Sequence, residues 1–237
     1  MARMMTRRTA AATLASVVLT PEVRADGNVD VQLVLAVDTS GSVNRERFEL
    51  QRLGYVAAFR TAEVLKTIKR GQTGAVAITM TQWTGPAQQA QVIPWSRISN
   101  EQEFAAFAKA IEDAPRRLFG GGTSISGAID HARTLFPACP YPSIRRTIDV
   151  SGDGATNRGR PSYAARDDAV ADGITINGLP IIALERDLDD HYREQVIGGP
   201  GAFMVVTETF ENFGEAIRRK LIQELAWWRA GPEIVRV

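Results

Sequence analysis

The fold of this chain is decided by Val31-Gln32-Leu33-Val34-Leu35-Ala36-Val37, which is followed directly by Asp38-Thr39-Ser40-Gly41-Ser42. A short run so rich in Val and Leu is typical of a strand that is buried on both faces. A carboxylate and two hydroxyls then stand at alternate positions where the strand should end. In an open α/β sheet, ligands bind outside the carboxyl ends of the strands. The sequence therefore predicts a ligand site immediately after this strand.

Further apolar, β-branched runs predict strands at Ala75–Met80, Gln91–Trp95, Thr147–Val150, Leu179–Leu184 and Phe203–Val206. Helical patterns alternate with most of them, over Arg45–Lys69, Phe104–Ile111, Ile125–Phe136 and Phe210–Leu225. This alternation predicts an α/β fold with a doubly wound, mostly parallel sheet and helices on both faces. Because Gln91–Trp95 follows its predecessor after a short connection, we expect a hairpin and one antiparallel edge strand.

The polar residues after the first strand suit a hard cation that prefers oxygen ligands. Mg²⁺ is the best match to one carboxylate and two neutral hydroxyls, and Mn²⁺ or Ca²⁺ are alternatives. Two later segments offer further ligands: Thr123 in Gly120-Gly121-Gly122-Thr123-Ser124, and Asp153 in Ser151-Gly152-Asp153-Gly154. The predicted metal ligands are Asp38, Ser40, Ser42, Thr123 and Asp153. The local alternative is that Asp38 and Ser40 only cap the next helix.

Together these five residues resemble the metal-ion-dependent adhesion site of von Willebrand factor type A domains, including the I domains of integrins. The phrases Ile148–Gly154 and Ile176–Pro180 also resemble an exported bacterial branch of that superfamily whose function is not established. The resemblance covers residues 29–226 and leaves 227–237 as a short C-terminal tail. It implies a Rossmann-like fold in which the metal bridges to a Glu or Asp carboxylate of a partner protein.

Catalysis is the main alternative to binding. The glycine-rich segment before Thr123 lacks the lysine of a phosphate-binding loop. A phosphatase of the aspartyl-phosphate type needs a second Asp two residues after Asp38, where Ser40 stands. The two histidines, His131 and His191, are expected on solvated surfaces, and Asp149 is expected to be a buried carboxylate bonded to backbone. We therefore expect no catalytic residues and no enzyme.

A metal-dependent hydrolase that uses the same site remains the alternative, and a structural domain with an unused site is a third hypothesis. A hydrolase needs a base that activates water beside the metal. A His, a Lys or a spare carboxylate within reach of the metal would favour it. Six arginines lie near the three site loops in sequence and are either solvated or a basic rim for an acidic partner: Arg45, Arg47, Arg116, Arg117, Arg158 and Arg160.

The N-terminus predicts export. Three arginines precede the apolar stretch Ala10–Leu19, and Val23-Arg24-Ala25 offers a cleavage site, so residues 1–25 are interpreted as a signal peptide of a periplasmic or secreted protein. Whether the general secretory or the twin-arginine route is used stays open. No later segment resembles a membrane span. The formal net charge of +1 gives no sign of a nucleic-acid partner, and the single Cys139 leaves only an intermolecular disulfide open. The oligomeric state is not indicated.

Overall fold

The computed structural model describes residues 27–226 and 234–236. The predicted signal peptide, residues 1–25, lies outside this described part of the chain. Within the described residues, no helix is both long and apolar enough to cross a membrane.

A seven-stranded sheet forms the centre of the molecule, in the order β3-β2-β1-β4-β5-β6-β7. All neighbouring strands are parallel except β2 and β3, which form an antiparallel hairpin at one edge. This confirms the predicted fold class and its antiparallel edge strand. The strands are β1 (Gln32–Asp38), β2 (Val76–Trp83), β3 (Gln89–Ile98), β4 (Arg146–Gly152), β5 (Ile174–Pro180), β6 (Met204–Val206) and β7 (Ile234–Arg236).

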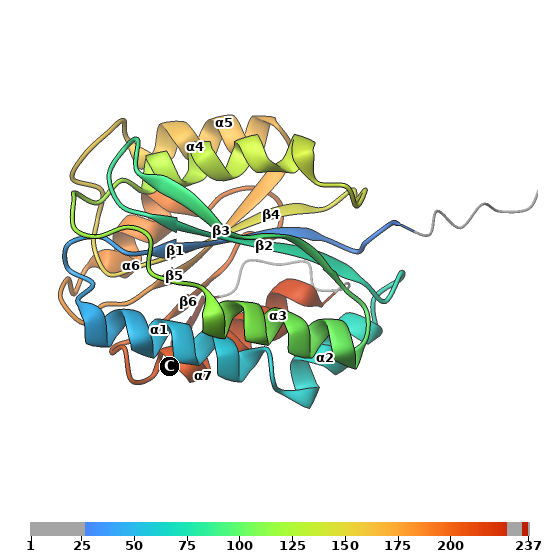
Figure 1. Cartoon of the computed structure of the whole chain (residues 1–237). Coiled ribbons are helices and arrows are strands. Elements are labelled where there is room, and N and C mark those ends of the chain that lie inside the picture. The colour runs from blue at the N-terminus through green and yellow to red at the C-terminus, as the bar shows by residue number, and fades with distance from the viewer. Residues whose placement is uncertain (1–26, 227–233, 237) are drawn as a thin grey trace, which may run out of the picture.

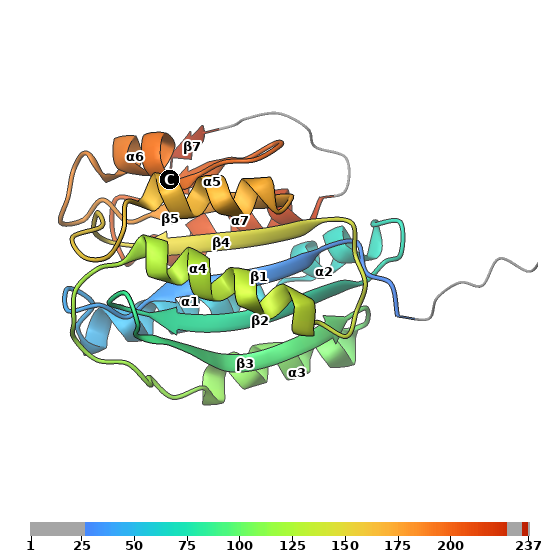
Figure 2. The same ribbon diagram turned by 90° about the horizontal axis from the view of Figure 1, so that it is seen from above.

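Helices cover both faces of the sheet (Figure 1). One layer contains α1 (Arg45–Ala58), α2 (Ala62–Lys69), α3 (Glu101–Asp113) and α7 (Phe213–Leu225). The other contains α4 (Ile125–Leu135) and α5 (Ser162–Ala171), with the short α6 (Leu188–His191) beside them (Figure 2). A 3₁₀ turn, Phe136–Ala138, follows α4, and a π turn, Tyr192–Val196, follows α6.

Strand β1 is buried along its whole length, as its composition predicts. Leu33, Leu35 and Val37 pack into the core beneath α1, α3 and α7. Val34 and Ala36 pack into the core beneath α4 and α5. Because successive side chains of a strand point to opposite faces, a strand between two helical layers must be apolar at every position. After Gln32 at the start of the strand, the next polar residue is Asp38, which therefore marks the sheet edge.

Three predictions of element bounds were wrong. The fifth strand is Ile174–Pro180 rather than Leu179–Leu184, because the buried Asn177 interrupts the apolar pattern; its side chain accepts from the N–H of Phe203, just before β6, and donates to Glu224 on α7. The predicted helix Arg45–Lys69 is two helices, α1 and α2, since the chain is extended at Thr61. The predicted tail, residues 227–237, contains strand β7, which pairs with β6.

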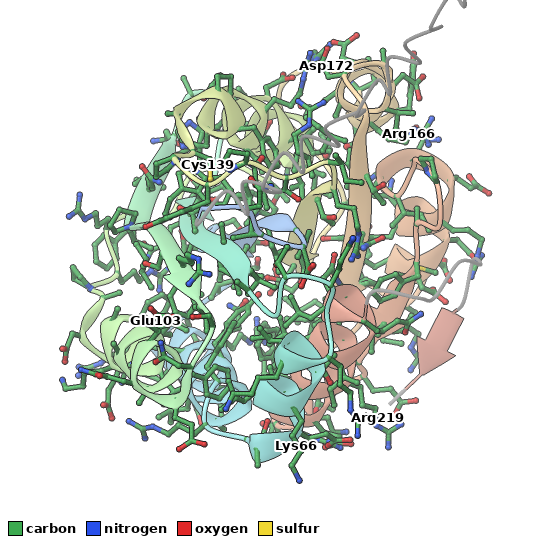
Figure 3. All side chains as sticks on the ribbon, turned by 90° about the vertical axis from the view of Figure 1, so that its right-hand side faces the viewer. Lys66, Glu103, Cys139, Arg166, Asp172 and Arg219 are labelled. Carbon is green, nitrogen blue, oxygen red and sulfur yellow. The ribbon has the colours of Figure 1, made fainter. Side chains whose placement is uncertain are left out.

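Figure 3 looks at the end of the sheet where the parallel strands begin, and Cys139 lies there. Its half-buried thiol is 3.6 Å from the carbonyl oxygen of Tyr141, and burial raises its pKa. The predicted metal ligands lie at the other end, where β1 and β4 finish. Cys139 is thus separated from them by the length of the sheet.

Candidate metal centre

The turn after β1 places three of the predicted ligands together. The backbone N–H of Ser40 donates to Oδ1 of Asp38 at 2.7 Å, and the hydroxyls of Ser40 and Ser42 are 3.1 Å apart. The side chain of Gln51, on α1, donates to the carbonyl oxygen of Asp38 at 3.3 Å. The turn is therefore tied to both the strand before it and the helix after it.

Asp153 reaches the same point from the end of β4. The Ser42 hydroxyl donates to Oδ1 of Asp153 at 2.5 Å, although the two residues are 111 positions apart in sequence. Parallel pairing of β1 with β4 brings their carboxyl ends side by side, with Val37 opposite Ser151. The continuous contact from Asp38 through Ser40 and Ser42 to Asp153 follows from this pairing.

Thr123 comes from the loop between α3 and α4. Its backbone N–H donates to Oδ1 of Asn157 at 2.9 Å, and the N–H of Asn157 donates back to the Thr123 carbonyl at 3.0 Å. Its hydroxyl oxygen is 3.9 Å from the position that a Cβ would take at Gly154. The structure thus brings Thr123 beside the Asp153 loop, and all five predicted ligands gather at one edge of the sheet.

The glycine-rich segment before Thr123 shapes this loop. Gly120 and Gly121 adopt φ values of 65° and 86°, in the left-handed region that glycine tolerates best. The carbonyl oxygen of Gly121 is 3.3 Å from the position of a Cβ at Gly41, so the two loops lie against each other. The glycines therefore allow the backbones of the two loops to pack closely against each other.

The capping alternative for Asp38 and Ser40 is wrong for the helix that follows them. Asn44 is the N-cap of α1, and its side chain accepts from the backbone N–H of Arg47 at 2.9 Å. Asp38 and Ser40 are buried behind it, with 0% and 1% exposure. The side-chain oxygens of Asp38 and Ser40 therefore do not cap α1.

Burial sets the electrostatics of the two carboxylates. Burial, and after it the nearby charge of Asp153, raise the pKa of Asp38 from 3.8 to about 7, against the opposing effect of the Ser40 N–H. Burial also raises the pKa of Asp153, while the Ser42 hydroxyl and the Arg47 guanidinium lower it. Two carboxylates held close in a water-poor place repel each other. A bound cation would remove that repulsion.

The unpaired atoms of the site fit such a cation. Oδ2 of Asp38 and Oδ2 of Asp153 are buried and accept no hydrogen bond from any described residue, although Arg47 approaches the latter at 3.8 Å. Buried carboxylate oxygens without donors are uncommon. In the described part of the chain, no three His, Cys, Asp or Glu side chains cluster closely enough to hold a metal. A cation here would thus depend on the hydroxyls as well as the two carboxylates.

Proton-transfer groups lie nearer the site than the sequence predicts. Glu185, after β5, accepts from the N–H of Ala155 at 2.7 Å, and its Oε2 is 3.7 Å from the Cβ position of Gly154. His191 is half-buried rather than on an exposed face; burial lowers its pKa, and the charge of Glu185 raises it. Glu185 was not predicted from the sequence, because it lies in a loop with charges of both signs that follows β5, the strand whose bounds were predicted wrongly.

Sequence reasoning also missed a buried ion cluster below the site. Asp149 is not bonded to backbone as expected: its Oδ1 is 2.7 Å from Nζ of Lys220, on α7. Lys220 also contacts Glu224 at 2.8 Å, and Glu224 accepts from Asn177 at 2.7 Å. All three charged side chains are at most 2% exposed. The cluster joins α7 to the middle of the sheet.

Only some of the six arginines near the site loops are free to form the predicted basic rim. Arg160 pairs with Asp130 and Asp168 on α4 and α5, whereas Arg47 and Arg116 donate to the carbonyl oxygens of Ser42 and Thr39. Three side chains remain exposed and have no hydrogen bond or ion pair with any described residue: Arg45, Arg117 and Arg158. These three can meet a partner.

The fold is that of a von Willebrand factor type A domain, as comparisons with solved structures show. The chain belongs to the family described as DUF1194, proteins of unknown function, whose family model matches residues 28–228. No curated protein sequence matches it.

Three solved structures illustrate the similarity, and each covers 84% of this chain. Proximal thread matrix protein 1 from the mussel byssus is 18% identical, with 49% of its own length covered and a TM-score of 0.60. A von Willebrand factor type A protein from Catenulispora acidiphila is 14% identical, with 43% covered and a TM-score of 0.58. The domain of the pilus tip protein Mfa5 from Porphyromonas gingivalis is 10% identical, with 95% covered and a TM-score of 0.58. The chain thus spans about half or less of the first two proteins.

Proposed function

We propose that this protein is an exported recognition protein that binds Mg²⁺ through Asp38, Ser40, Ser42, Thr123 and Asp153, and a partner protein through that metal. The observation that carries the proposal is the pair of buried carboxylate oxygens, one on Asp38 and one on Asp153, that no described residue satisfies. Mg²⁺ suits a small set of hard oxygen ligands and leaves positions for outside oxygens. A solved structure of the mussel protein is described as having a zinc-occupied site of this type, which supports a divalent cation.

The donor set favours recognition. Only two carboxylates face three neutral hydroxyls, so the bound cation keeps enough positive character to attract an anion. A Glu or Asp side chain of a protein partner supplies such an anion. The exposed Arg117 and Arg158 add positive charge around the site, which favours an acidic partner surface. Phe119, 71% exposed on the same loop as Arg117, adds apolar surface.

Export rests on the predicted signal peptide. Two of the similar proteins are a byssal matrix protein and a pilus tip protein, which supports a role outside the cytoplasm. The proposed location is the periplasm or the exterior. Fractionation of cells that produce the full chain, followed by mass measurement of the mature protein, checks this, with cleavage after Ala25 as the expected result.

The proposed binding is tested with acidic peptides and with proteins of the exported fraction. We expect capture in Mg²⁺, loss of capture with chelator, and competition by a Glu-containing peptide but not by its Gln counterpart. Asp38→Ala and Thr123→Ala should abolish capture without unfolding the protein. Asp172→Ala, at the far end of the sheet (Figure 3), is the matched control. Capture that survives both the chelator and Asp38→Ala would refute the metal-bridged mechanism.

A metal-dependent hydrolase is the second candidate, because Glu185 and His191 lie nearer the site than expected. A carboxylate beside a metal can act as a general base for water. Against it, Glu185 already accepts a hydrogen bond from Ala155. We expect no turnover of phosphate esters, carboxylic esters or peptides with Mg²⁺ or Mn²⁺. Turnover that disappears in both Asp38→Ala and Glu185→Gln would establish an enzyme instead.

A further inference from the structure

A buried tyrosine below the metal centre has no hydrogen-bond partner. Tyr192 begins the π turn after α6, and its side chain is fully buried. Its hydroxyl makes no hydrogen bond to any described residue. Single π turns often occur at functional sites. A buried hydroxyl without a partner calls for a specific explanation, because nearly all buried polar groups are satisfied.

Two glycines on neighbouring strands make room for this tyrosine. A Cβ at Gly178, on β5, would lie 2.6 Å from Cδ1 of Tyr192. A Cβ at Gly152, on β4, would lie 3.0 Å from the Tyr192 hydroxyl oxygen. A real Cβ would clash with the ring at Gly178 and would be unusually close to the hydroxyl at Gly152. The ring therefore rests against β5, and its hydroxyl reaches the end of β4, next to Asp153.

The Tyr192 hydroxyl meets two other unsatisfied groups there. The same Cβ position at Gly152 is 3.0 Å from Oδ2 of Asp38 and 3.2 Å from Cζ2 of Trp83. Neither Oδ2 of Asp38 nor Nε1 of Trp83 has a hydrogen-bond partner in the described part of the chain. An acceptor without a donor, Oδ2 of Asp38, and a donor without an acceptor, the Tyr192 hydroxyl, thus lie beside the same point at Gly152, with the Trp83 ring next to them.

We propose that Tyr192 is a positioning residue of the metal centre, whose hydroxyl donates to Oδ2 of Asp38 through one buried water molecule. Oδ1 of the same carboxylate already accepts from the N–H of Ser40. Each carboxylate oxygen can take more than one interaction, so a donor on each oxygen holds the carboxylate in one orientation and still leaves Oδ2 able to face the cation. The inference rests on the proposed metal site and adds to it a residue outside the five ligands.

The electrostatics agree with this arrangement. After burial itself, the charge of Asp38 is the largest influence that raises the pKa of Tyr192, followed by that of Asp153. The Tyr192 hydroxyl therefore stays protonated and acts as a donor. Groups that orient a metal ligand from behind typically change metal affinity 10- to 100-fold when removed.

The test is a calorimetric titration of the full-length protein with Mg²⁺ and with Mn²⁺ alone. We expect Tyr192→Phe to bind both metals about 10- to 100-fold more weakly, while the melting temperature of the metal-free protein stays the same or rises. The matched control is Tyr55→Phe, which removes another buried tyrosine hydroxyl, 3.4 Å from the hydroxyl of Ser151. This control should bind metal as the wild type does.

A second variant protects the test against misfolding of the first. Gly178→Ala adds a methyl group that must push the Tyr192 ring away, without changing any atom of the metal centre. It should weaken metal binding in the same direction as Tyr192→Phe.

The outcomes separate the two proposals. Wild-type affinity in Tyr192→Phe, or an equal loss in Tyr55→Phe, would overturn the role of Tyr192 and leave the metal site intact. A wild-type protein that binds neither metal would overturn the proposed function itself.

Discussion

Asp38 and Asp149 are both fully buried aspartates, on adjacent parallel strands, but the protein treats them differently. Asp149 has the ammonium group of Lys220 at 2.7 Å, whereas one oxygen of Asp38 has no partner among the described residues. Burial raises the pKa of Asp149 to about 6, against the pull of Lys220, and that of Asp38 to about 7, with Asp153 adding to the rise.

The difference between the two aspartates shows that the protein neutralises the buried charge of Asp149 with its own lysine but not that of Asp38. An unpaired buried charge is strongly destabilising, so it is either neutralised by a proton or matched by an opposite charge. Lys220 belongs to the chain and arrives with α7. Among the described residues, no Lys or Arg forms an ion pair with Asp38, and the ion pair of Asp153 with Arg47 is longer, at 3.8 Å. The comparison therefore assigns Asp149 to the fold and supports the proposed role of Asp38 as a metal ligand.

The largest effect is expected at the compensated aspartate. Lys220→Met leaves Asp149 and Glu224 buried without their cation and should lower the free energy of unfolding by about 3–5 kcal/mol. Urea denaturation measures this. Lys109→Met is the control, because the ion pair of Lys109 with Asp113 is exposed and should contribute less than about 1 kcal/mol. A loss at Lys220 no larger than at Lys109 would show that the cluster is solvated.

The next effect concerns pH in the metal-free protein. Because the pKa of Asp38 is raised from 3.8 to about 7 on folding, the folded state holds a proton that the unfolded state releases. The resulting stabilisation is complete below about pH 4 and is lost as pH rises through about 7, a change of about 2–4 kcal/mol. Asp38→Asn should remove this part of the pH dependence. The free energies of unfolding of wild type and variant are compared in chelator from pH 4 to 7.5. A difference between them that does not change with pH would contradict the raised pKa of Asp38.

The sequence predicted the edge of the sheet better than its interior. Asp38 and Asp153 were predicted because small polar residues directly after apolar runs stand out, and parallel pairing brings such ends together. Thr123 was predicted from the glycine-rich segment before it and from the resemblance to a known metal site. Lys220 and Glu224 were missed because charged residues on a helix normally face solvent, and only the packing of α7 on the sheet buries them. Tyr192 was missed because its position depends on two glycines, Gly152 and Gly178, whose common neighbour is visible only in three dimensions.

Added Mg²⁺ should restore the stability that the metal-free protein loses as the pH rises, because the cation offsets the charge of Asp38. At a Mg²⁺ concentration 100 times the dissociation constant, binding stabilises the folded state by about 2.7 kcal/mol. Asp38→Asn and Thr123→Val should lose most of this gain in stability and should keep the fold, since neither change touches the buried ion cluster of Asp149, Lys220 and Glu224. Thermal melts with and without Mg²⁺ measure the gain. A full metal-dependent gain in both variants would remove these residues from the metal centre.

The smallest effect has the opposite sign and concerns Arg47, the arginine beside Asp153. The Arg47 guanidinium lies 3.8 Å from Oδ2 of Asp153, donates to the Ser42 carbonyl at 2.7 Å and stacks on Phe210 at 5.2 Å. Arg47→Met keeps much of the apolar contact but removes a positive charge that competes with the metal. Because the side chain is partly exposed and screened, we expect only a two- to fivefold gain in Mg²⁺ affinity, or about 0.5–1 kcal/mol. Arg45→Met, which removes an exposed arginine two residues away, should change the affinity less, and high salt should shrink the difference. Weaker Mg²⁺ binding in Arg47→Met would mean that Arg47 holds the Ser42 turn in place, and that its contact with the carbonyl outweighs its charge.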